Sequence, residues 1–501
     1  AITEDGGPQG ERRIYWISTD DADGIVISPT KLVARTTTEL VRAGAKALIF
    51  CRSRVSTEMA VRQIRSQLAP NEVDMVDSSR GGYSTKERRE IEQRFLSGSL
   101  SALVATNAME LGVDVGAIDS VILHGIPGRV ASFWQQIGRA GRGGQPSIAL
   151  AIAHDDPLEQ FYLRNPSYLT NAVVESSAVA VDQLHIRQSQ LRCAAYERPI
   201  SSDEQLQYWP NALGQLKDME QAGEIQFSAD RWFYPSHDSP AKNVNIRGAS
   251  SDTVQLIVSG EELGSMEYWR AIQQAHAGAI YMHRGQTYVV ENLDLNARQA
   301  SLRRTDVNTY TMPIVQSIVE PEITVESSEN IALVAAKVTT AMLGYRTIDL
   351  ESRTIIGETA LDMPTQTLQT IALQVTWPVN MNDEMLGDIT AMHGLQHVLH
   401  TVAPAIAGCD RQDFGSAWYG LFAPTMESAV FLFDVVEGGI GLSESLYAKR
   451  NELLLAAQHL LAGCGCDDGC PRCLLSSSCE SANENLSRRL TLERLNLMLD
   501  G

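Results

Sequence analysis

The sequence predicts an α/β protein in which a parallel-sheet lobe is followed by mixed α+β regions. Over residues 1–155, short apolar segments alternate with amphipathic ones, as in a parallel sheet covered by helices on both faces. Beyond residue 245 the pattern turns β-rich, and five cysteines gather near the C-terminus. With 44% hydrophobic and 20% charged residues, the chain has the composition of an ordinary globular protein. Its 501 residues favour about three domains by length alone.

The elements of residues 1–155 follow from their apolar spacing. Residues 45–51 predict a buried strand, and the next helix has its apolar stripe over 60–68 and stops at Pro70. Ser84 and Glu87 form a capping box, which opens a helix with Ile91, Phe95 and Leu96 turned inward. Further strands are expected at 74–76, 102–106, 120–124 and 147–153.

The rest of the chain divides by pattern into three more regions. Residues 156–245 are mostly helical, with a short hairpin at 230–234. Residues 281–290 predict two strands around a glycine turn, and a leucine-rich helix is expected from 484. The order of elements between 330 and 460 does not follow from the sequence. We expect domains at 1–155, 156–245, 246–330 and 331–501.

The charge is unevenly distributed. The net charge is −20, yet residues 1–150 have a balance of +1 and the remainder a balance of −21. This excludes wrapping of nucleic acid by the whole surface and leaves the first segment as the place for a local basic groove. No apolar run approaches the ~18 residues of a membrane helix, and no secretory signal is visible. We therefore expect a cytoplasmic protein with no membrane partner.

The most specific stretch is Gln135-Gln136-Ile137-Gly138-Arg139-Ala140-Gly141-Arg142. Its small residues let the backbone approach a ligand closely, and two guanidiniums three residues apart can reach one phosphate chain. This is the chemistry of an arginine finger in phosphoryl transfer. The spacing alone is equally compatible with a surface loop rich in glycine and arginine.

Three upstream blocks place this stretch in context. They are Phe50–Arg54, Arg80–Tyr83 and Ala102–Asp114. Together with the Gln135–Arg142 stretch, and in this order and spacing, the blocks resemble motifs IV, V and VI of the second RecA-like domain of a superfamily two helicase. The resemblance covers residues 1–155 and implies a RecA-like lobe there.

The resemblance implies roles for individual residues. Arg139 and Arg142 correspond to the arginines that reach ATP, and Gln135 opens their motif. The arginines of the upstream blocks are equally explained, one by one, as solvated surface charges. The residues implied at the nucleotide are Gln135, Gly138, Arg139, Arg142 and Asp114, and those implied at the nucleic-acid backbone are Arg52, Ser53, Arg80, Gly82, Thr106 and Gly112.

The parts of a helicase that the sequence lacks are equally informative. It contains no G-x-x-x-x-G-K-[ST] loop for the β/γ-phosphates and no acidic box for Mg²⁺ after an apolar strand. The chain therefore supplies one wall of an ATP site. We expect the first RecA-like domain on an N-terminal part of the same protein or on another chain. ATP and Mg²⁺ would be used by the complete enzyme, and this chain alone would show no appreciable ATPase.

The cysteine cluster predicts a structural metal site. Cys470 and Cys473 form a C-x2-C knuckle suited to one tetrahedral Zn²⁺, and Cys464 and Cys466 can supply the other pair. Cys479 is the spare ligand, or it replaces one of that pair. Free thiols, a redox pair and an iron–sulfur cluster are the alternatives to zinc.

The cluster extends the resemblance. Residues 463–473 with Ser478-Cys479 and Asn483–Asn485 resemble the C-terminal zinc-cysteine domain of the mitomycin-repair-factor type of DNA helicase. Residues 191–199 resemble that family's entry into a winged-helix region, and residues 434–441 its glycine turn before the last helices. The family includes bacterial monomeric 3′–5′ helicases. The strong acidity of the C-terminal portion is a departure from the family pattern, and it argues against a broad DNA-binding role for that portion.

One weaker pattern lies at His393-x3-His397-x2-His400, which has helical metal spacing but no companion glutamate. Polar positions of an amphipathic helix explain it as well.

Together these features predict the C-terminal portion of an ATP-dependent 3′–5′ DNA helicase. Its partners would be single-stranded DNA or a 3′-tailed duplex, and its role would be in DNA repair. The alternatives are a non-catalytic zinc-containing DNA-binding scaffold and an RNA helicase of the same superfamily, because motifs IV to VI do not report the sugar.

Overall fold

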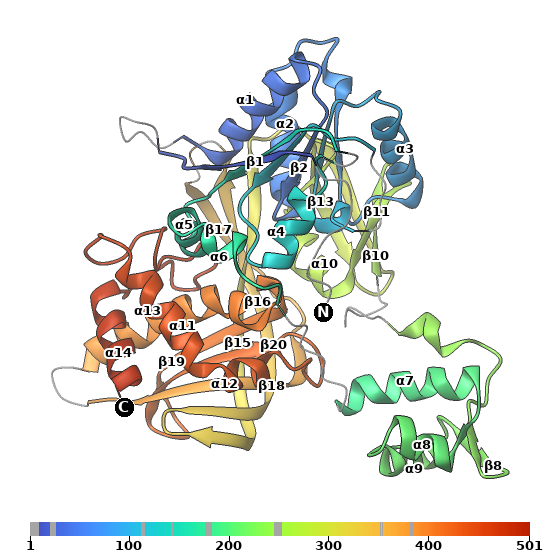
Figure 1. Cartoon of the computed structure of the whole chain (residues 1–501). Helices are drawn as coiled ribbons and strands as arrows, with labels where there is room; N and C mark the ends of the chain where they lie inside the picture. The colour runs from blue at the N-terminus through green and yellow to red at the C-terminus, as the bar shows by residue number, and fades with distance from the viewer. Residues whose placement is uncertain are drawn as a thin grey trace.

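The computed structural model describes residues 10–20, 27–111, 116–141, 144–175, 183–244, 253–350, 352, 354–380 and 385–500. It consists of a parallel α/β lobe, a small separate helical domain, a β-rich domain and a C-terminal α+β domain (Figure 1). Among the described helices, none is both long and apolar enough to cross a membrane.

The N-terminal lobe is built on a six-stranded sheet in the order β1-β6-β5-β2-β4-β3. Every neighbouring pair is parallel, so the predicted fold class is confirmed. The third strand begins two residues later than expected, because Val73–Met75 forms a 3-10 turn. The strands are β1 (Arg12–Ile17), β2 (Ala47–Cys51), β3 (Val76–Ser79), β4 (Ala102–Ala105), β5 (Ser120–His124) and β6 (Ser147–Ile152).

Helices cover both faces of this sheet. In β2, Leu48 and Phe50 face the core that includes Phe95 and Phe133, whereas Ile49 faces the opposite core. This alternation is why the strand is apolar throughout. The expectation for Leu96 is wrong: it is 49% exposed at the helix end, after Ile91 and Phe95 have filled the core. The helices are α1 (Pro29–Arg42), α2 (Arg54–Arg65), α3 (Thr85–Leu96), α4 (Val130–Ile137), α5 (Pro157–Arg164) and α6 (Ser167–Thr170).

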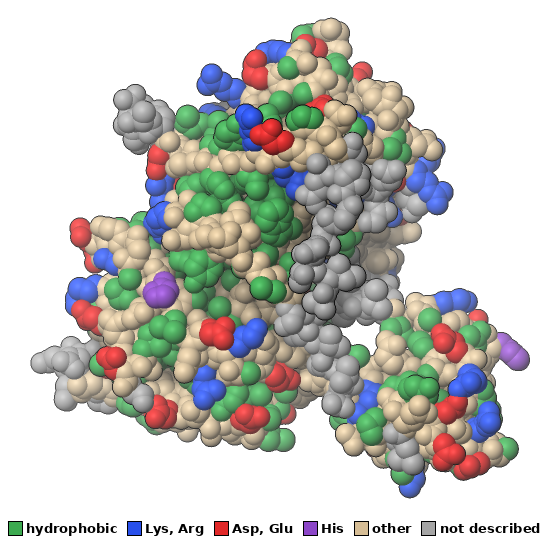
Figure 2. All heavy atoms as spheres, in the orientation of Figure 1, with side chains coloured by type: hydrophobic (Ala, Val, Ile, Leu, Met, Phe, Trp, Pro, Cys, Tyr) green, Lys and Arg blue, Asp and Glu red, His purple; other side chains and the backbone are tan. Residues whose placement is uncertain are grey.

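The second domain stands to one side of the main body (Figures 1 and 2). Its core packs Leu191, Leu216 and Trp232 around a three-stranded sheet in the order β7-β9-β8. The predicted hairpin is formed by the last two strands, whose turn residues Ala229 and Asp230 have positive φ. Its elements are α7 (Leu184–Glu197), β7 (Ile200–Ser201), α8 (Ser202–Tyr208), α9 (Leu213–Gln221), β8 (Gln226–Ser228) and β9 (Arg231–Phe233).

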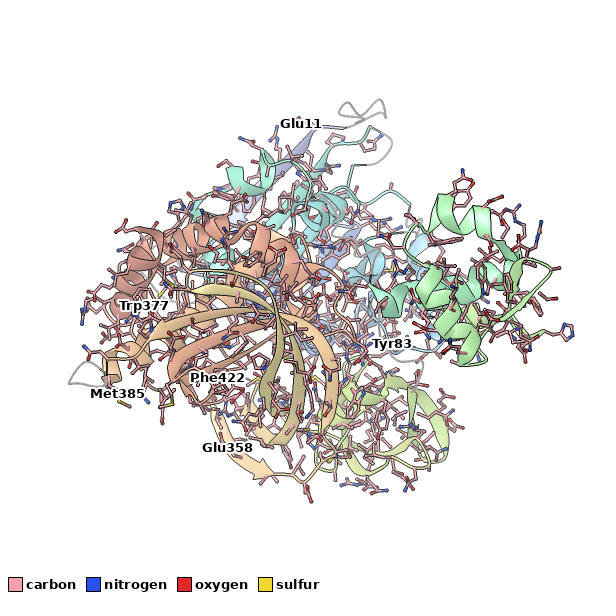
Figure 3. The ribbon with its side chains drawn as sticks, turned by 90° about the horizontal axis from the view of Figure 1, so that it is seen from below. Glu11, Tyr83, Glu358, Trp377, Met385 and Phe422 are labelled. Atoms are coloured by element: carbon pink, nitrogen blue, oxygen red, sulfur yellow. The ribbon has the colours of Figure 1, made fainter. Side chains whose placement is uncertain are left out.

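The β-rich domain is a five-stranded sheet in the order β11-β10-β14-β13-β12. The predicted pair of strands around Gly285 is the β12–β13 hairpin. The tip of that hairpin reaches the first lobe, where Tyr83 lies (Figure 3). The elements are β10 (Thr253–Val258), β11 (Glu261–Glu267), α10 (Tyr268–Gln274), β12 (Ile280–His283), β13 (Gln286–Asp294) and β14 (Gln299–Thr305).

The C-terminal domain has an antiparallel sheet in the order β15-β16-β18-β20-β19, with β17 paired to β16. The long β15–β16 hairpin spans the boundary that we expected at residue 330. The sequence conceals this hairpin because residues of β15 are largely half-buried or exposed. The strands are β15 (Thr309–Ser328), β16 (Ile331–Asp349), β17 (Ile355–Ala360), β18 (Gln366–Pro378), β19 (Phe414–Phe422) and β20 (Glu427–Asp434).

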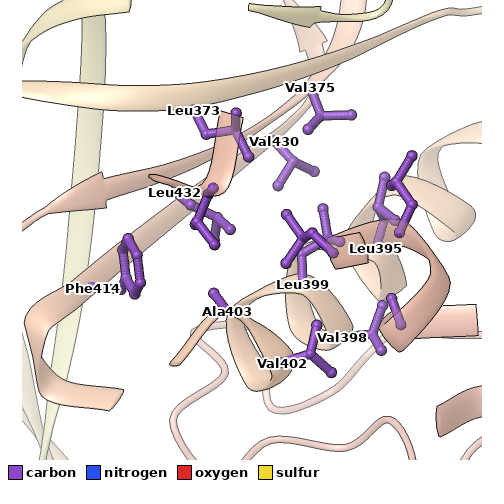
Figure 4. Close-up of a cluster of buried hydrophobic side chains, with 14 of the residues drawn as sticks. Leu373, Val375, Leu395, Val398, Leu399, Val402, Ala403, Phe414, Val430 and Leu432 are labelled. Carbon is purple, nitrogen blue, oxygen red and sulfur yellow. The ribbon is translucent and has the colours of Figure 1, made fainter. Parts of the chain in front are cut away.

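One long helix, α11 (Met385–Ala407), covers a face of this sheet (Figure 4). Leu395 and Leu399 of the helix pack with Leu373, Val430 and Leu432 of the strands. The helix has apolar residues all around because three further helices enclose its other side. These are α12 (Leu442–Ala448), α13 (Arg450–Ala462) and α14 (Arg488–Asp500).

Candidate functional site

Three strands of the first lobe end at one edge of the sheet, and each is followed by residues implied in nucleic-acid contact. Arg52 follows β2; its side chain is 36% exposed, and its guanidinium pairs with Glu159 and with Asp156 at 3.4 Å. Arg411 also donates to Asp156, at 2.8 Å. Burial would raise the pKa of Asp156, but the two arginines lower it to about 2. Arg52 is thus held by acidic partners with part of its surface open.

Arg80, which follows β3, is placed differently. Its side chain is 1% exposed, its Nε donates to Glu58 at 2.6 Å, and it also donates to the Met282 carbonyl. In this arrangement the guanidinium has no surface from which to reach a phosphate. It joins the lobe to the β-rich domain instead, so the geometry speaks against the expected DNA contact.

The other implied nucleic-acid residues that the structure describes are small. Ser53 is the N-cap of α2, where its hydroxyl accepts from the Ser56 N–H. Thr106 follows β4 and is 9% exposed, with its N–H bonded to the Ser79 carbonyl at 3.3 Å. Gly82 has a φ of +101°. Its carbonyl oxygen lies so near Gly264 that a Cβ on Gly264 would stand 2.3 Å from that oxygen. The absence of a side chain at Gly264 therefore permits a close backbone approach between two domains at Gly82.

Two residues of the Gln135–Arg142 stretch, Gln136 and Arg139, bond to Glu110 in the segment after β4. Arg139 is 4% exposed, and its Nε donates to the Glu110 carbonyl at 3.1 Å. Gln136 donates to the Glu110 carboxylate at 3.0 Å. Gln135 is exposed, and a Cβ at Gly138 would lie 2.6 Å from the Trp134 carbonyl. Two blocks identified separately in the sequence thus form one unit.

Three predicted nucleotide or backbone residues lie outside the described residues. They are Gly112, Asp114 and Arg142.

Four of the five clustered cysteines converge. The Sγ atoms of Cys464, Cys466, Cys470 and Cys473 all lie within 4.8 Å of one another. The Sγ–Sγ distances of neighbouring pairs are 3.5–3.8 Å. A regular tetrahedron around Zn²⁺ with Zn–S bonds of about 2.3 Å has edges of roughly 3.8 Å. The donor set and its spacing therefore fit one structural zinc ion.

The surrounding loop is tied to the rest of the molecule. The Cys470 N–H donates to Cys473 Sγ at 3.4 Å, and Arg488 donates to the Cys466 carbonyl at 2.7 Å. Arg472, between the two knuckle cysteines, pairs with Asp20 at 2.5 Å and Asp155 at 2.8 Å in the first lobe. The loop that carries the four cysteines is therefore held to the first lobe by ion pairs.

Cys479 is apart from these four thiols and lies with two histidines of α11. His393, His397 and Cys479 form a second buried group whose ligand atoms are within 4.8 Å of one another. His400 is not in this group, because its Nε2 faces the Phe414 carbonyl at 3.3 Å. Burial lowers the pKa of His400 to about 4, helped by the charge of Arg411.

The sequence patterns did not identify several acidic residues that organise the site. Glu58, Glu110 and Asp156 act through neighbours distant along the chain, so no local pattern marks them. Asp434 had a visible signal, the glycine turn that follows it. Its carboxylate accepts the N–H groups of Ile440, Leu442 and Ser443 and so caps α12.

Three family models match the chain. The helicase conserved C-terminal domain matches residues 31–144, the winged helix domain of the ATP-dependent helicase HRQ1 matches 179–249, and the MrfA Zn-binding domain matches 395–474. With the parallel lobe and the four-thiol loop, these matches define the class: a helicase motor lobe followed by winged-helix and zinc-binding domains.

Solved structures and curated relatives narrow the class. The DUF1998 helicase MrfA bound to DNA is 30% identical, with a TM-score of 0.74 over 99% of this chain and 67% of that one. The chain belongs to this MrfA family of DNA helicases. The ATP-dependent helicase YprA of Bacillus subtilis is 31% identical over 94% of this chain, and hrq1 of Schizosaccharomyces pombe is 28% identical over 87%. The chain spans 65% and 43% of these two relatives.

Proposed function

We propose that this chain is the C-terminal portion of an ATP-dependent helicase that moves 3′ to 5′ along single-stranded DNA and acts in DNA repair. The supporting observation is the unit formed by Glu110, Gln136 and Arg139, which joins the segment after β4 to the Gln135–Arg142 stretch. Through this unit, a change at the nucleotide would reach Thr106. Thr106 lies at the edge of the sheet where we expect the DNA strand to bind.

In this mechanism the nucleotide binds between the lobe described here and a first RecA-like domain of the same protein. By the family resemblance, the residues that would contact ATP are Gln135, Gly138, Arg139, Arg142 and Asp114. In the structure Arg139 donates a hydrogen bond to the Glu110 carbonyl. To contact a γ-phosphate, Arg139 would have to give up that hydrogen bond. The guanidiniums then stabilise the charge that develops on the transferred phosphoryl group.

Arg52, Ser53 and Thr106, which follow strands at the carboxyl edge of the sheet, would grip nucleic acid together with Gly112. Opening and closing of the lobes alternates this grip and produces steps along the strand. Arg80 and Gly82 support the edge from within, because one is buried in an ion pair and the other contacts the β-rich domain. MrfA has been solved bound to DNA, which favours DNA as the partner of this chain as well.

The zinc ion has a structural role in this proposal, since four protein thiolates leave no open position. We further propose that the complete protein is a cytoplasmic monomer. The chain alone is inactive as an ATPase, because its sequence contains no loop of the Walker A type.

The decisive experiment uses the complete protein with its first RecA-like domain. ATPase activity is measured with single-stranded DNA and with RNA of the same sequence, and unwinding with 3′-tailed and 5′-tailed duplexes. We expect stimulation by DNA, unwinding from the 3′ tail, and a loss of kcat of about 10³-fold or more in Arg139→Ala. Equal ATPase in Arg139→Ala would favour the scaffold, and stimulation by RNA alone would favour an RNA helicase. Arg13→Ala, an exposed arginine on β1, is the matched control.

A further inference from the structure

We propose that His393, His397 and Cys479 form a second zinc site, distinct from the four-cysteine cluster. The three residues are 0%, 5% and 7% exposed, and their ligand atoms converge within 4.8 Å. Cys479 Sγ lies 3.4 Å from His393 Nε2. In a tetrahedral site with ordinary Zn–S and Zn–N bonds, a sulfur and a nitrogen ligand are roughly 3.5 Å apart. The observed spacing is therefore that of two ligands of one ion.

The histidines are oriented as metal ligands require. They lie four residues apart on α11 and so share one face of the helix. His397 Nδ1 lies 2.9 Å from the Leu474 carbonyl, and His393 Nδ1 lies 3.3 Å from the Asn485 carbonyl. Donation from each Nδ1–H to its carbonyl leaves both Nε2 lone pairs free. A backbone carbonyl on the second ring nitrogen is the usual outer partner of a ligating histidine.

The surroundings hold these groups in place before any ion binds. Trp418 stacks on His393, with ring centroids 4.3 Å apart and planes 8° from parallel. Arg346 of β16 donates to the Cys479 carbonyl at 3.2 Å. Asn483 and Ser476 exchange two hydrogen bonds, at 2.8 and 2.9 Å, across the loop that presents Cys479. A rigid loop and a rigid helix thus meet at the three donors, as a preorganised site requires.

The donor set selects zinc by its chemistry. One thiolate with two imidazoles suits a borderline-soft ion of tetrahedral preference, and it does not suit calcium or magnesium, which take oxygen ligands. Three protein ligands leave a fourth position, and Ser481 Oγ lies 3.4 Å from Cys479 Sγ beside it. A water molecule or this hydroxyl completes the tetrahedron. The ion would fasten α11 to the loop that follows the first zinc cluster.

Two of the three ligands lie outside the match to the MrfA Zn-binding domain, and His397 lies within it. The MrfA Zn-binding model ends at residue 474, before Cys479, and begins at 395, after His393. The site also differs from the first in composition, because it contributes nitrogen ligands and the first contributes only sulfur. This difference makes the two ions separable by experiment.

The test counts zinc in the chain after passage over a chelating resin. We expect two zinc ions per wild-type chain and one in Cys479→Ala. The double variant Cys464→Ser with Cys470→Ser should also retain one. Cys409→Ser, which changes a buried cysteine outside both groups, is the matched control and should retain two. One zinc ion in the wild type, unchanged in Cys479→Ala, would overturn the proposal.

A second measurement avoids variants that fail to fold. X-ray absorption at the zinc edge of the wild-type chain reports the average ligand shell. We expect a mixed sulfur and nitrogen shell with the outer scattering of imidazole rings. An all-sulfur shell would overturn the proposal, because only the four-cysteine site would then hold zinc.

Discussion

Arg80 donates its Nε proton to Glu58 at 2.6 Å, and both side chains are 1% exposed. Glu58 also accepts from the Tyr83 hydroxyl at 2.5 Å and from the Gly285 N–H at 2.7 Å. The last of these donors belongs to the β12–β13 hairpin, so this carboxylate joins two domains.

The buried pair predicts a large loss of stability when one partner is removed. Glu58→Gln leaves the Arg80 guanidinium buried without its counter-charge, which costs about 3–5 kcal/mol. Urea denaturation followed by fluorescence measures the loss. Arg13→Ala, which breaks a solvent-exposed pair with Glu11, should leave the free energy of unfolding nearly unchanged. Equal effects of the two substitutions would contradict a cross-domain role for Glu58.

Asp156 predicts a pH-dependent contribution to stability. Its pKa in the folded chain, about 2, is below the ordinary value of 3.8, so the contribution is present above pH 4 and is lost as the pH falls toward 2. The shift corresponds to about 2 kcal/mol at neutral pH. Asp156→Asn keeps a side chain that can cap α5 but removes the charge.

The measurement for Asp156 is the free energy of unfolding of wild type and Asp156→Asn between pH 7 and pH 3. We expect the difference between them to stay level from pH 7 to about pH 5 and to shrink as the pH approaches 3. A difference that stays constant over this range would mean that the two arginines do not stabilise the carboxylate.

Arg52 predicts a salt-dependent contribution to DNA binding in the complete protein. If its exposed portion meets a phosphate, Arg52→Gln removes one counterion release, and the slope of log K against log salt falls by about 0.7. Binding of fluorescent single-stranded DNA over a salt series provides the measurement. Arg13→Gln serves as the control because it lies on an edge strand of the sheet. An unchanged slope in Arg52→Gln would mean that Arg52 pairs only with its acidic partners and contacts no phosphate.

The Arg472 contacts predict that zinc in the four-cysteine site stabilises the adjoining part of the motor lobe. Removal of that ion by a chelator should increase amide hydrogen exchange in residues 464–475 and also around Asp155. Arg472→Ala should increase exchange around Asp155 while the zinc content is unchanged, because its guanidinium makes both contacts. Protection around Asp155 that survives in both cases would argue against this link.

Local patterns were sufficient for much of the fold and for the four-thiol site. The apolar segments of residues 45–51, 120–124 and 147–153 specified buried parallel strands, because both faces of such a strand meet helices. Cys464 to Cys473 are close along the chain, so a short loop brings their thiols together whatever the rest of the molecule does. The Ser84–Glu87 capping box formed for the same local reason.

Long-range packing settled what these patterns left open. Arg80 has the sequence context of a strand-gripping residue, yet Glu58 and Met282 enclose it from 22 and 202 positions away. The sequence alone leaves Cys479 as the spare thiol of its cluster. In the folded chain it lies beside His393, which is 86 residues earlier. A sequence shows which groups can ionise or bind, but their partners and their exposure depend on contacts between distant segments, which arise only when the chain has folded.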